Sequence, residues 1–512
     1  EVLLLKTDTQ SQNNNIALNQ SRMPFVEALE AYKVERFAAF HTPGHKLGVG
    51  APHTLKLWME PALPYDLGVM YALDDLHEPE GSLKEAQDLA AQLYGADHTW
   101  FSINGTTALI ETMIMGTVGA GDTIIIPREA HRSVMGGLIL SGAKPVYLEG
   151  RFDERWGVPL GTTPEEVERV LAEHPEAKAI VLVNPNYYGI AIDLEAIVAS
   201  AHRRGVIVLV DEAHGAHLQF GEKLPKSALA CGADLVAQST HKLIGSLTQT
   251  SMLHGQGSLI NERRITQVHQ ILQSTSPNYI FLASLDMARQ QMATEGHELV
   301  TEAEQLAMEL RRDLQQIPGI KVPAAEDFNA IYAYDATKVL IDFYELGLTG
   351  VEAEKRLRQE GIEVELVQAY HVLVLITIGD TKESIKRLVK AVQNVSAQIL
   401  GVTSPGTQTN AKQAVTAEGP LATGTQLTKP EVVLTPREGF YSQTVTVNLA
   451  DAEGKLSGET ISYYPPGIPF VSVGERITPA VLAYIKERQV MGFVPNGCAD
   501  KTLKTIRVIS EA

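Results

Sequence analysis

The chain has 512 residues, of which 44% are hydrophobic and 20% charged, and its formal net charge is −18. This length exceeds one hydrophobic core and predicts two or three domains of ordinary globular composition. The negative charge argues against nucleic acid as a partner and favours small cationic molecules. No apolar run reaches the length of a membrane span, and the two cysteines are too few for a disulfide framework or a metal cluster, so we expect a cytoplasmic protein.

The first three hundred residues predict a flexible arm followed by a large α/β domain. Residues 1–22 are polar and are expected to form the arm. Between 23 and 300, helical stretches alternate with apolar runs that lack polar alternation, as expected of a mainly parallel sheet covered by helices on both faces. The clearest of these strands are predicted at 123–126, 179–183 and 206–210. Ser82 and Glu85 predict a capping box that opens a helix ending at Gly95.

The rest of the chain predicts two smaller units separated by a linker. Residues 301–400 are expected to form a small α+β domain in which Thr349 caps a helix that ends at Gly361. Its other predicted elements are a helix at 302–315 and strands at 339–342, 362–366 and 372–377. Residues 401–430 are rich in Thr, Gln, Gly, Ala and Pro, which indicates a linker. Residues 431–512 predict a C-terminal α+β module with a strand at 444–447 and a rigid proline-rich segment at 464–469.

Lys242 carries the strongest chemical signal in the chain. About nine in ten lysines taken at random are solvated surface groups. Here an apolar run at 235–237 brings the chain up as a strand, hydroxyl and imidazole groups occupy 239–241, and small residues follow at 245–248. A lysine held in such a loop can form a Schiff base with the aldehyde of pyridoxal 5′-phosphate. The pattern predicts that Lys242 is the catalytic lysine of an enzyme that uses this cofactor.

Three further residues fit the ring of the same cofactor, each with a plainer alternative. Asp211 ends a predicted strand, where its carboxylate could keep the pyridine nitrogen protonated, or could cap the following turn. His214 could meet the phenolic oxygen of the ring or be a packed core histidine. His131 follows the strand at 123–126 and could stack on the ring face and take part in catalysis, or be an exposed loop histidine.

A phosphate site is predicted where an apolar stretch enters a helix near residue 105. A glycine permits a tight turn there, and the amides and hydroxyls that follow point along a helix N-terminus. By itself this pattern is also that of a plain N-cap. The residues expected to hold the phosphate are Gly105, Thr106, Thr107, Ser239 and His241.

The sequence gives no reason to expect a bound metal or a nucleotide. His41 and His45 have i, i+4 spacing, but Pro43 and Gly44 between them break the helix that would align the two rings. Neither a Walker loop nor a Gly-x-Gly-x-x-Gly fingerprint is present.

Six dispersed motifs together resemble the ornithine/lysine/arginine decarboxylases, pyridoxal-phosphate enzymes of the aspartate-aminotransferase fold (fold type I). The likeness is closest to the short bacterial arginine/lysine decarboxylases, which lack a receiver-like domain. It covers nearly all of the chain except the arm and the linker. The motifs lie at 40–46, 73–77, 210–215, 239–242, 247–249 and 464–469.

The resemblance implies a homodimer, or a higher homo-oligomer, whose active sites are shared between subunits. It implies that Thr275 contributes to the partner's phosphate site and that Glu475 lies near the distal cation of the substrate. Val473 stands where the family usually has a proline before Gly474, which puts the placement of Glu475 in question.

The implied reaction is decarboxylation of a basic L-amino acid, with no nucleic acid or membrane as partner. Arginine is favoured as the substrate, giving agmatine and CO2 for polyamine biosynthesis, because the short bacterial forms are usually assigned to it. Lysine giving cadaverine and ornithine giving putrescine are the alternatives, since no motif separates a guanidinium pocket from an ammonium pocket. An aminotransferase or an aldolase-type lyase, and a non-catalytic pyridoxal-phosphate-binding regulator, are further alternatives.

Overall fold

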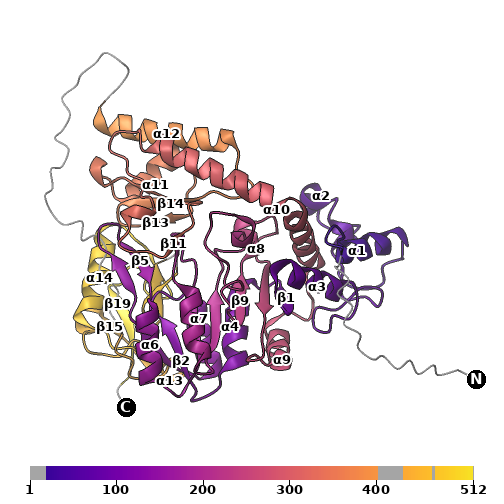
Figure 1. Cartoon of the computed structure of the whole chain (residues 1–512), viewed down its shortest axis with the longest axis horizontal. Coiled ribbons are helices and arrows are strands. Elements are labelled where there is room, and N and C mark those ends of the chain that lie inside the picture. Colours follow the sequence, from indigo (N-terminus) through magenta and orange to yellow (C-terminus); the bar gives the residue numbers. More distant parts are fainter. Residues whose placement is uncertain (1–18, 402–429, 464–466, 511–512) are drawn as a thin grey trace, which may run out of the picture.

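The computed structural model describes residues 19–401, 430–463 and 467–510. The large domain is built on a seven-stranded sheet of order β1-β10-β9-β8-β6-β2-β3 (Figure 1). The strands from β9 to β3 are parallel, whereas β10 is antiparallel to both β1 and β9. Their bounds are β1 His98–Ser102, β2 Thr123–Pro127, β3 Lys144–Leu148, β6 Ala177–Val183, β8 Ile207–Asp211, β9 Leu235–Gln238 and β10 Ser251–Gly255. The predicted mainly parallel sheet and its three clearest strands are confirmed.

Helices cover both faces of this sheet, which explains why its strands are apolar at consecutive positions. Ile125 faces one hydrophobic cluster, and its neighbours Ile124 and Ile126 face another, because successive side chains of a strand point to opposite sides. The first cluster receives α1 Pro24–Val34, α3 Ser82–Tyr94, α6 Pro164–Glu173, α7 Leu194–His202 and α10 Tyr279–Leu314. The second receives α4 Gly105–Thr117, α5 Arg132–Ser141 and α9 Glu262–Leu272.

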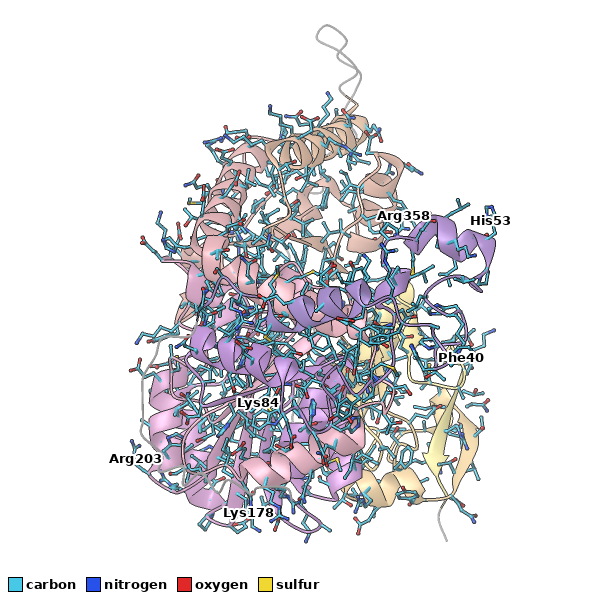
Figure 2. The ribbon with its side chains drawn as sticks, turned by 90° about the vertical axis from the view of Figure 1, so that its right-hand side faces the viewer. Phe40, His53, Lys84, Lys178, Arg203 and Arg358 are labelled. Carbon is cyan, nitrogen blue, oxygen red and sulfur yellow. The ribbon has the colours of Figure 1, made fainter. Side chains whose placement is uncertain are left out.

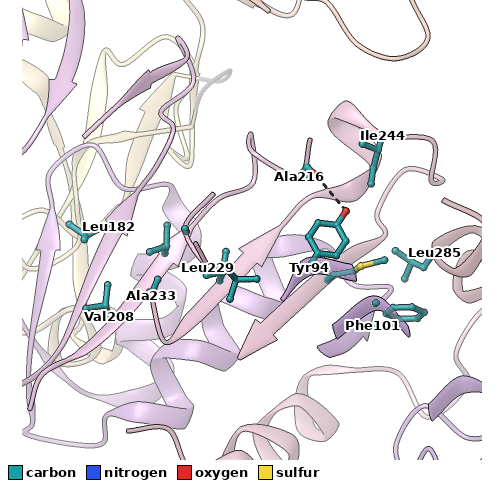
Figure 3. Packing of buried hydrophobic residues seen from close by; sticks show 14 of the residues in the cluster. Tyr94, Phe101, Leu182, Val208, Ala216, Leu229, Ala233, Ile244 and Leu285 are labelled. Atoms are coloured by element: carbon teal, nitrogen blue, oxygen red, sulfur yellow. Dashed lines mark hydrogen bonds between the residues drawn. The ribbon is translucent and has the colours of Figure 1, made fainter. Parts of the chain in front are cut away.

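Figure 3 shows the first cluster around Tyr94, whose ring lies among apolar side chains from strands and helices. Its hydroxyl donates to the carbonyl of Ala216 at 3.4 Å, so the polar end of the ring has a partner inside the core. Full burial of one large apolar side chain stabilises a fold by about 1.5–3 kcal/mol. Phe101 and Leu182, which are almost fully buried in this cluster, each contribute on that scale.

Helix α3 begins and ends where the sequence predicts, but its cap is different. Ser82 is the first helical residue, and its side chain caps nothing. The helix is capped instead by Asp74, which lies outside it, so the predicted capping box is wrong. Its carboxylate accepts from the backbone amides of Glu80, Gly81, Leu83 and Lys84. At the other end, Gly95 has the left-handed conformation expected of a helix-ending glycine.

The small domain is joined to the large one through a helix rather than a loop. Helix α10 has 36 residues, and its buried side chains up to Val300 belong to the large-domain core, whereas those from Ala303 onward belong to a second core. That core packs the three-stranded sheet β12-β14-β13 against α10 and two further helices. The bounds are β12 Lys338–Asp342, β13 Leu366–Val367, β14 His371–Leu375, α11 Gly350–Gln359 and α12 Lys382–Leu400.

Thr349 caps α11 in a full capping box with Glu352, as the sequence predicts. The strand predicted at 362–366 is wrong except at its end, because Ile362 still belongs to the helix terminus. Its amide donates to the carbonyl of Leu357 at 2.9 Å, so it is not free to join a sheet.

The C-terminal module packs beside the large domain (Figure 1). It contains the pair β15–β19 and the sheet β17-β16-β18 around a small core of its own. The bounds are α13 Pro436–Tyr441, β15 Thr444–Asn448, β16 Ile461–Tyr463, β17 Pro469–Val471, α14 Pro479–Val490, β18 Pro495–Asn496 and β19 Thr505–Ile509. Helix α13 is anchored to α5 by the Arg437 side chain, which donates to the carbonyl of Ile139 at 2.7 Å.

The predicted arm and linker fall mostly outside the described residues. Residues 1–18 of the arm, 402–429 of the linker and 464–466 of the proline-rich segment are in that position. The end of the arm is docked rather than flexible, because Arg289 donates to the carbonyls of Gln20 and Arg22. Within the described part of the chain, no helix is long and apolar enough to cross a bilayer.

The remaining elements are short. They are α2 His53–Met59, α8 Thr240–Leu243, the hairpin of β4 Arg151–Asp153 with β5 Val158–Gly161, and the antiparallel pair of β7 Ile190–Ala191 with β11 Ala333–Tyr334.

Candidate active site

A cavity of about 430 Å³ opens at the carboxyl ends of the parallel strands, where α/β sheets usually bind their ligands. All but two of the site residues predicted from the sequence line it. They are Gly105, Thr106, Thr107, His131, Asp211, His214, Ser239, His241 and Lys242. They come from four separate segments, each at or just after the end of a strand of the central sheet.

Lys242 lies on α8, the short helix that follows β9. Its Nζ is 2.9 Å from His214 Nε2 and 5.5 Å from the centre of the Tyr187 ring. Burial lowers the pKa of Lys242, and the nearby Asp211 carboxylate opposes that effect in part. A lowered pKa raises the fraction of free amine, which is the form that attacks an aldehyde.

Asp211 is buried at the end of β8 and lines the same cavity as Lys242. One carboxylate oxygen accepts from the amide of Ala213 at 3.1 Å, and burial raises the pKa of the group. Within the described residues, no lysine, arginine or histidine forms an ion pair with it. A buried carboxylate without a counter-ion suits a protonated pyridine nitrogen, which would supply the missing positive charge.

The N-terminus of α4 forms another part of the cavity wall. Helix α4 starts at Gly105, which has a φ of 72°, and a Cβ atom placed there would meet nothing within 4 Å. The glycine therefore leaves open space in front of the first turn. The hydroxyl of Thr106 is hydrogen-bonded to those of Ser239 and Ser251, the latter at 2.9 Å. Hydroxyls and a helix N-terminus in one place suit a phosphate.

The two histidines on the rim differ in what holds their rings. His241 Nδ1 donates to the carbonyl of Thr250 at 2.7 Å, since a carbonyl can only accept. His131 caps α5, and its Nδ1 accepts from the amide of Ser133. Burial, with the charge of Lys242, lowers the pKa of His131 to about 4. Its ring is therefore neutral near pH 7, which suits stacking on an aromatic ligand.

Tyr187 and Lys338 are site residues that sequence reasoning missed. The Tyr187 ring lies 4.1 Å from that of His214, and the Nζ of Lys338 donates to the carbonyl of His214 at 2.9 Å. Lys338 is fully buried in an ion pair with Asp335 and comes from the small domain, which no local pattern links to the site. Tyr187 could have been predicted from the sequence, because it closely follows the predicted strand at 179–183.

Two predicted residues lie away from this cavity. Thr275 is exposed on the connection between α9 and α10. Glu475 is buried, and its carboxylate accepts from the two terminal guanidinium nitrogens of Arg128, Nη1 at 3.1 Å and Nη2 at 3.2 Å. It also accepts from the hydroxyl of Tyr147 and the amide of Ser472. Glu475 therefore does not face the cavity of its own chain, contrary to the expectation. Its negative charge is paired with the buried Arg128 instead.

Known proteins are similar to this chain over nearly its whole length. Residues 23–332 match the model of the Orn/Lys/Arg decarboxylase major domain, and residues 421–493 match that of the C-terminal domain. The chain is 42% identical to the arginine decarboxylase of Bacillus subtilis (strain 168), over 96% of this chain and 99% of the relative. It is 41% identical to the arginine decarboxylase of Bacillus anthracis, over 96% and 98%.

Solved structures give the same fold. Lysine decarboxylase A from Pseudomonas aeruginosa superimposes with a TM-score of 0.81 at 24% identity, covering 95% of this chain and 80% of that one. A serine palmitoyltransferase from Sphingomonas wittichii has a TM-score of 0.52 at 16% identity, covering 75% and 87%. The predicted fold type I of pyridoxal-phosphate enzymes is thereby confirmed. With a family model that matches more than half of its length, the chain belongs to the Orn/Lys/Arg decarboxylase family.

Proposed function

We propose that this protein is an arginine decarboxylase that binds pyridoxal 5′-phosphate at Lys242 and releases agmatine and CO2. The family makes it a pyridoxal-phosphate-dependent amino acid decarboxylase. The observation that carries the proposal is that the Lys242 amine, the buried Asp211 carboxylate and the N-terminus of α4 line one cavity.

Each wall of the cavity has a separate task in this proposal. When bound, the cofactor supplies an electron sink for the electron pair that CO2 leaves behind. Asp211 keeps the pyridine nitrogen protonated, and the first turn of α4 with Ser239 and His241 holds the phosphate. The neutral ring of His131 covers the ring face, while His214 positions the Lys242 amine through the contact of 2.9 Å.

Proton delivery to the substrate Cα falls to Lys242, because His131, with a pKa of about 4, is neutral near pH 7 and is then a poor proton donor. Both side chains line the cavity, where they are only partly exposed to solvent. Ile468 from the C-terminal module closes part of the same wall. Exclusion of water there protects the carbanionic electron pair until the intended donor reaches it.

We favour arginine as the substrate over the other basic amino acids because of the names of the most similar relatives reported above. Those named arginine decarboxylase are 41–42% identical over almost the full length, whereas the lysine decarboxylase LdcA of Pseudomonas aeruginosa is 27% identical. Lysine and ornithine are the alternatives to be tested.

The proposed active unit is a homodimer. A group of exposed apolar side chains in the N-terminal segment supports this, and we call it the N-terminal patch. Its members are Val34, Phe37, Phe40, Val49, Leu57, Trp58 and Tyr71. Phe40 is 94% exposed and Trp58 is 80% exposed, and Figure 2 shows Phe40 and the helix of His53 on the outside of the molecule. Several large apolar side chains exposed on one segment favour an interaction surface there.

A cytoplasmic location is part of the proposal. Cys231 and Cys498 are both free thiols, as is usual in a reducing compartment. The proposed product belongs to polyamine synthesis from a cytoplasmic amino acid pool.

The direct test offers arginine, lysine and ornithine separately to the protein loaded with pyridoxal phosphate and identifies the released amine by mass. Agmatine with an equal amount of CO2 is expected, and Lys242→Ala should abolish it. Cadaverine or putrescine as the main product would reassign the substrate. A keto acid without CO2 would show an aminotransferase, and no product from any basic amino acid would favour a non-catalytic regulator.

A further inference from the structure

The wall of the cavity formed by the loop after β2 carries a carboxylate with no assigned task. Two carboxylates line the cavity within the described part of the chain, Asp211 and Glu129. Asp211 ends β8, whereas Glu129 follows β2, and β6 lies between these two strands. At the usual spacing of strands, the two loops are roughly 10 Å apart, about the reach of an extended basic side chain. Pro159 and Ile468 line the cavity with Glu129.

Glu129 is half-buried but has no counter-ion. Within the residues that the structure describes, no lysine, arginine or histidine forms an ion pair with it. Burial raises the pKa of the carboxyl, as expected when a charge loses water and gains no partner. Glu475, the acid that the family resemblance implies for the substrate cation, is already bound by Arg128. Among the described residues, Glu129 is therefore the carboxyl group of this chain's cavity that has neither an ion-pair partner nor a proposed role.

The loop that carries Glu129 is anchored on both sides. Before it, Arg128 binds Glu475 and donates to the carbonyl of Phe470 at 2.8 Å. After it, the amide of Arg132 donates to the carbonyl of Gly467 at 3.2 Å. The C-terminal module thus holds the loop in one position. A carboxylate in such a loop binds a ligand with little loss of conformational freedom.

Room for the carboxylate comes from a glycine on the neighbouring strand connection. A Cβ atom at Gly150 would lie 3.1 Å from Glu129 Oε2, closer than an ordinary contact. A side chain at 150, just after β3, would therefore require the Glu129 carboxylate to shift by a few tenths of an ångström.

We propose that Glu129 binds the cationic end of the substrate and thereby selects basic amino acids. This rests on the proposed decarboxylase function and adds the residue that recognises the side chain. The carboxylate accepts two parallel hydrogen bonds from a guanidinium, whereas an ammonium fills the same place with fewer bonds in fixed geometry. Glu129 acts on binding, because it lies on the wall away from Lys242 and Asp211.

The test compares Glu129→Gln with the wild-type enzyme on a charged and a neutral ligand of one shape. L-Arginine carries the cation, and L-citrulline replaces it with a neutral urea group. For arginine, Glu129→Gln should raise KM about tenfold to a hundredfold, the usual effect of losing a hydrogen bond between charged groups. The inhibition constant of citrulline should stay within about twofold, since a neutral group gains little from the lost charge.

Two further variants control for charge and folding. Glu149→Gln removes the same charge from an exposed position beside Gly150 and should leave both constants unchanged. Glu129→Asp keeps the charge on a shorter side chain and should recover part of the arginine affinity. Unchanged pyridoxal-phosphate absorbance and citrulline binding in Glu129→Gln show that the variant is folded.

The outcomes separate this inference from the proposed function. If the wild type releases agmatine and Glu129→Gln keeps the wild-type KM for arginine, the role of Glu129 is refuted while the decarboxylase function stands. Equal losses for arginine and citrulline would also refute it, because they would show damage to the cavity rather than a lost charge contact. If the wild type decarboxylates no basic amino acid, the proposed function itself fails.

Discussion

Burial fixes the charge of several histidines in the large domain, and His254 is the clearest case. It is fully buried on β10 and stacked on Tyr94, with ring centres 4.6 Å apart. Its Nδ1 is 2.8 Å from the hydroxyl of Thr99, and its Nε2 is 3.2 Å from the amide oxygen of Gln238. Burial lowers the pKa of His254 to about 3, so the ring is neutral in the folded protein.

This lowered pKa makes stability depend on pH with a definite sign. The ordinary pKa of histidine is about 6.5. Below that pH, His254 binds a proton in the unfolded state but not in the folded state. The free energy of unfolding should therefore fall as the pH falls from 6.5 toward 3, with a loss of about 2 kcal/mol from His254 by pH 5.

His254→Gln keeps polar groups at this position without a titrating ring. The difference in unfolding free energy between wild type and His254→Gln, measured by denaturant titration at pH 7 and pH 5, should shrink or reverse at the lower pH. Parallel losses in the two proteins would contradict the assignment, because the remaining histidines are common to both.

At the residue scale, the sequence predicts groups that act within one loop better than groups that meet across domains. Lys242, Asp211 and Gly105 each stand at the end of an apolar run, and the carboxyl ends of parallel strands converge in space. Nothing local in the sequence indicates that Arg128 takes up Glu475, since the two lie 347 positions apart. The same holds for Lys338, which reaches His214 from the small domain.

At the scale of one element, helix α3 depends on a residue that lies eight positions before its start. Asp74 accepts from four backbone amides at the N-terminus of α3, at 2.8–3.1 Å. A carboxylate at this end of a helix also interacts favourably with the helix dipole. The side chain of Ser82, by contrast, makes no capping hydrogen bond.

Replacement of the two candidate caps should give unequal losses of stability. Asp74→Ala should lower the free energy of unfolding by about 1–2 kcal/mol, the range measured for lost N-caps. Ser82→Ala should change it by less than about 0.5 kcal/mol, since partly exposed side chains without special contacts behave in that way. Equal losses on thermal or chemical denaturation would restore the capping box that the sequence suggests.

Element types were more predictable than their ends and caps. The apolar runs at 123–126 and 206–210 became β2 and β8 because burial on both faces leaves a signal in each residue. The run at 362–366 misled because Ile362 is apolar for a different reason, packing against the small-domain core while it ends a helix.

At the scale of the whole molecule, the three units meet around one cavity. The large domain supplies most of its wall, the C-terminal module adds Ile468, and the small domain supports His214 through Lys338. The N-terminal patch lies outside this arrangement and is exposed in the single chain. A homodimer would cover it.

A charge placed in the N-terminal patch should disrupt that dimer. Trp58→Glu would bury a carboxylate in the proposed interface, at a cost that an unpaired buried charge makes large. Sedimentation at micromolar concentration should show a dimer for the wild type and monomers for the variant, with lower activity if sites are shared. Val490→Glu alters a side chain of similar exposure on the C-terminal module and should leave the dimer intact. A dimeric Trp58→Glu would place the interface elsewhere.

The central claim is that Lys242 carries the cofactor, and reduction with borohydride tests it most directly. Reduction fixes the cofactor to its lysine, and mass spectrometry of the digested protein identifies the labelled peptide. We predict a phosphopyridoxyl group on Lys242 and none on Lys338, which lies in the same region but is fully buried and paired with Asp335. A label on any other lysine, or none on Lys242 in protein that releases agmatine, would contradict the account.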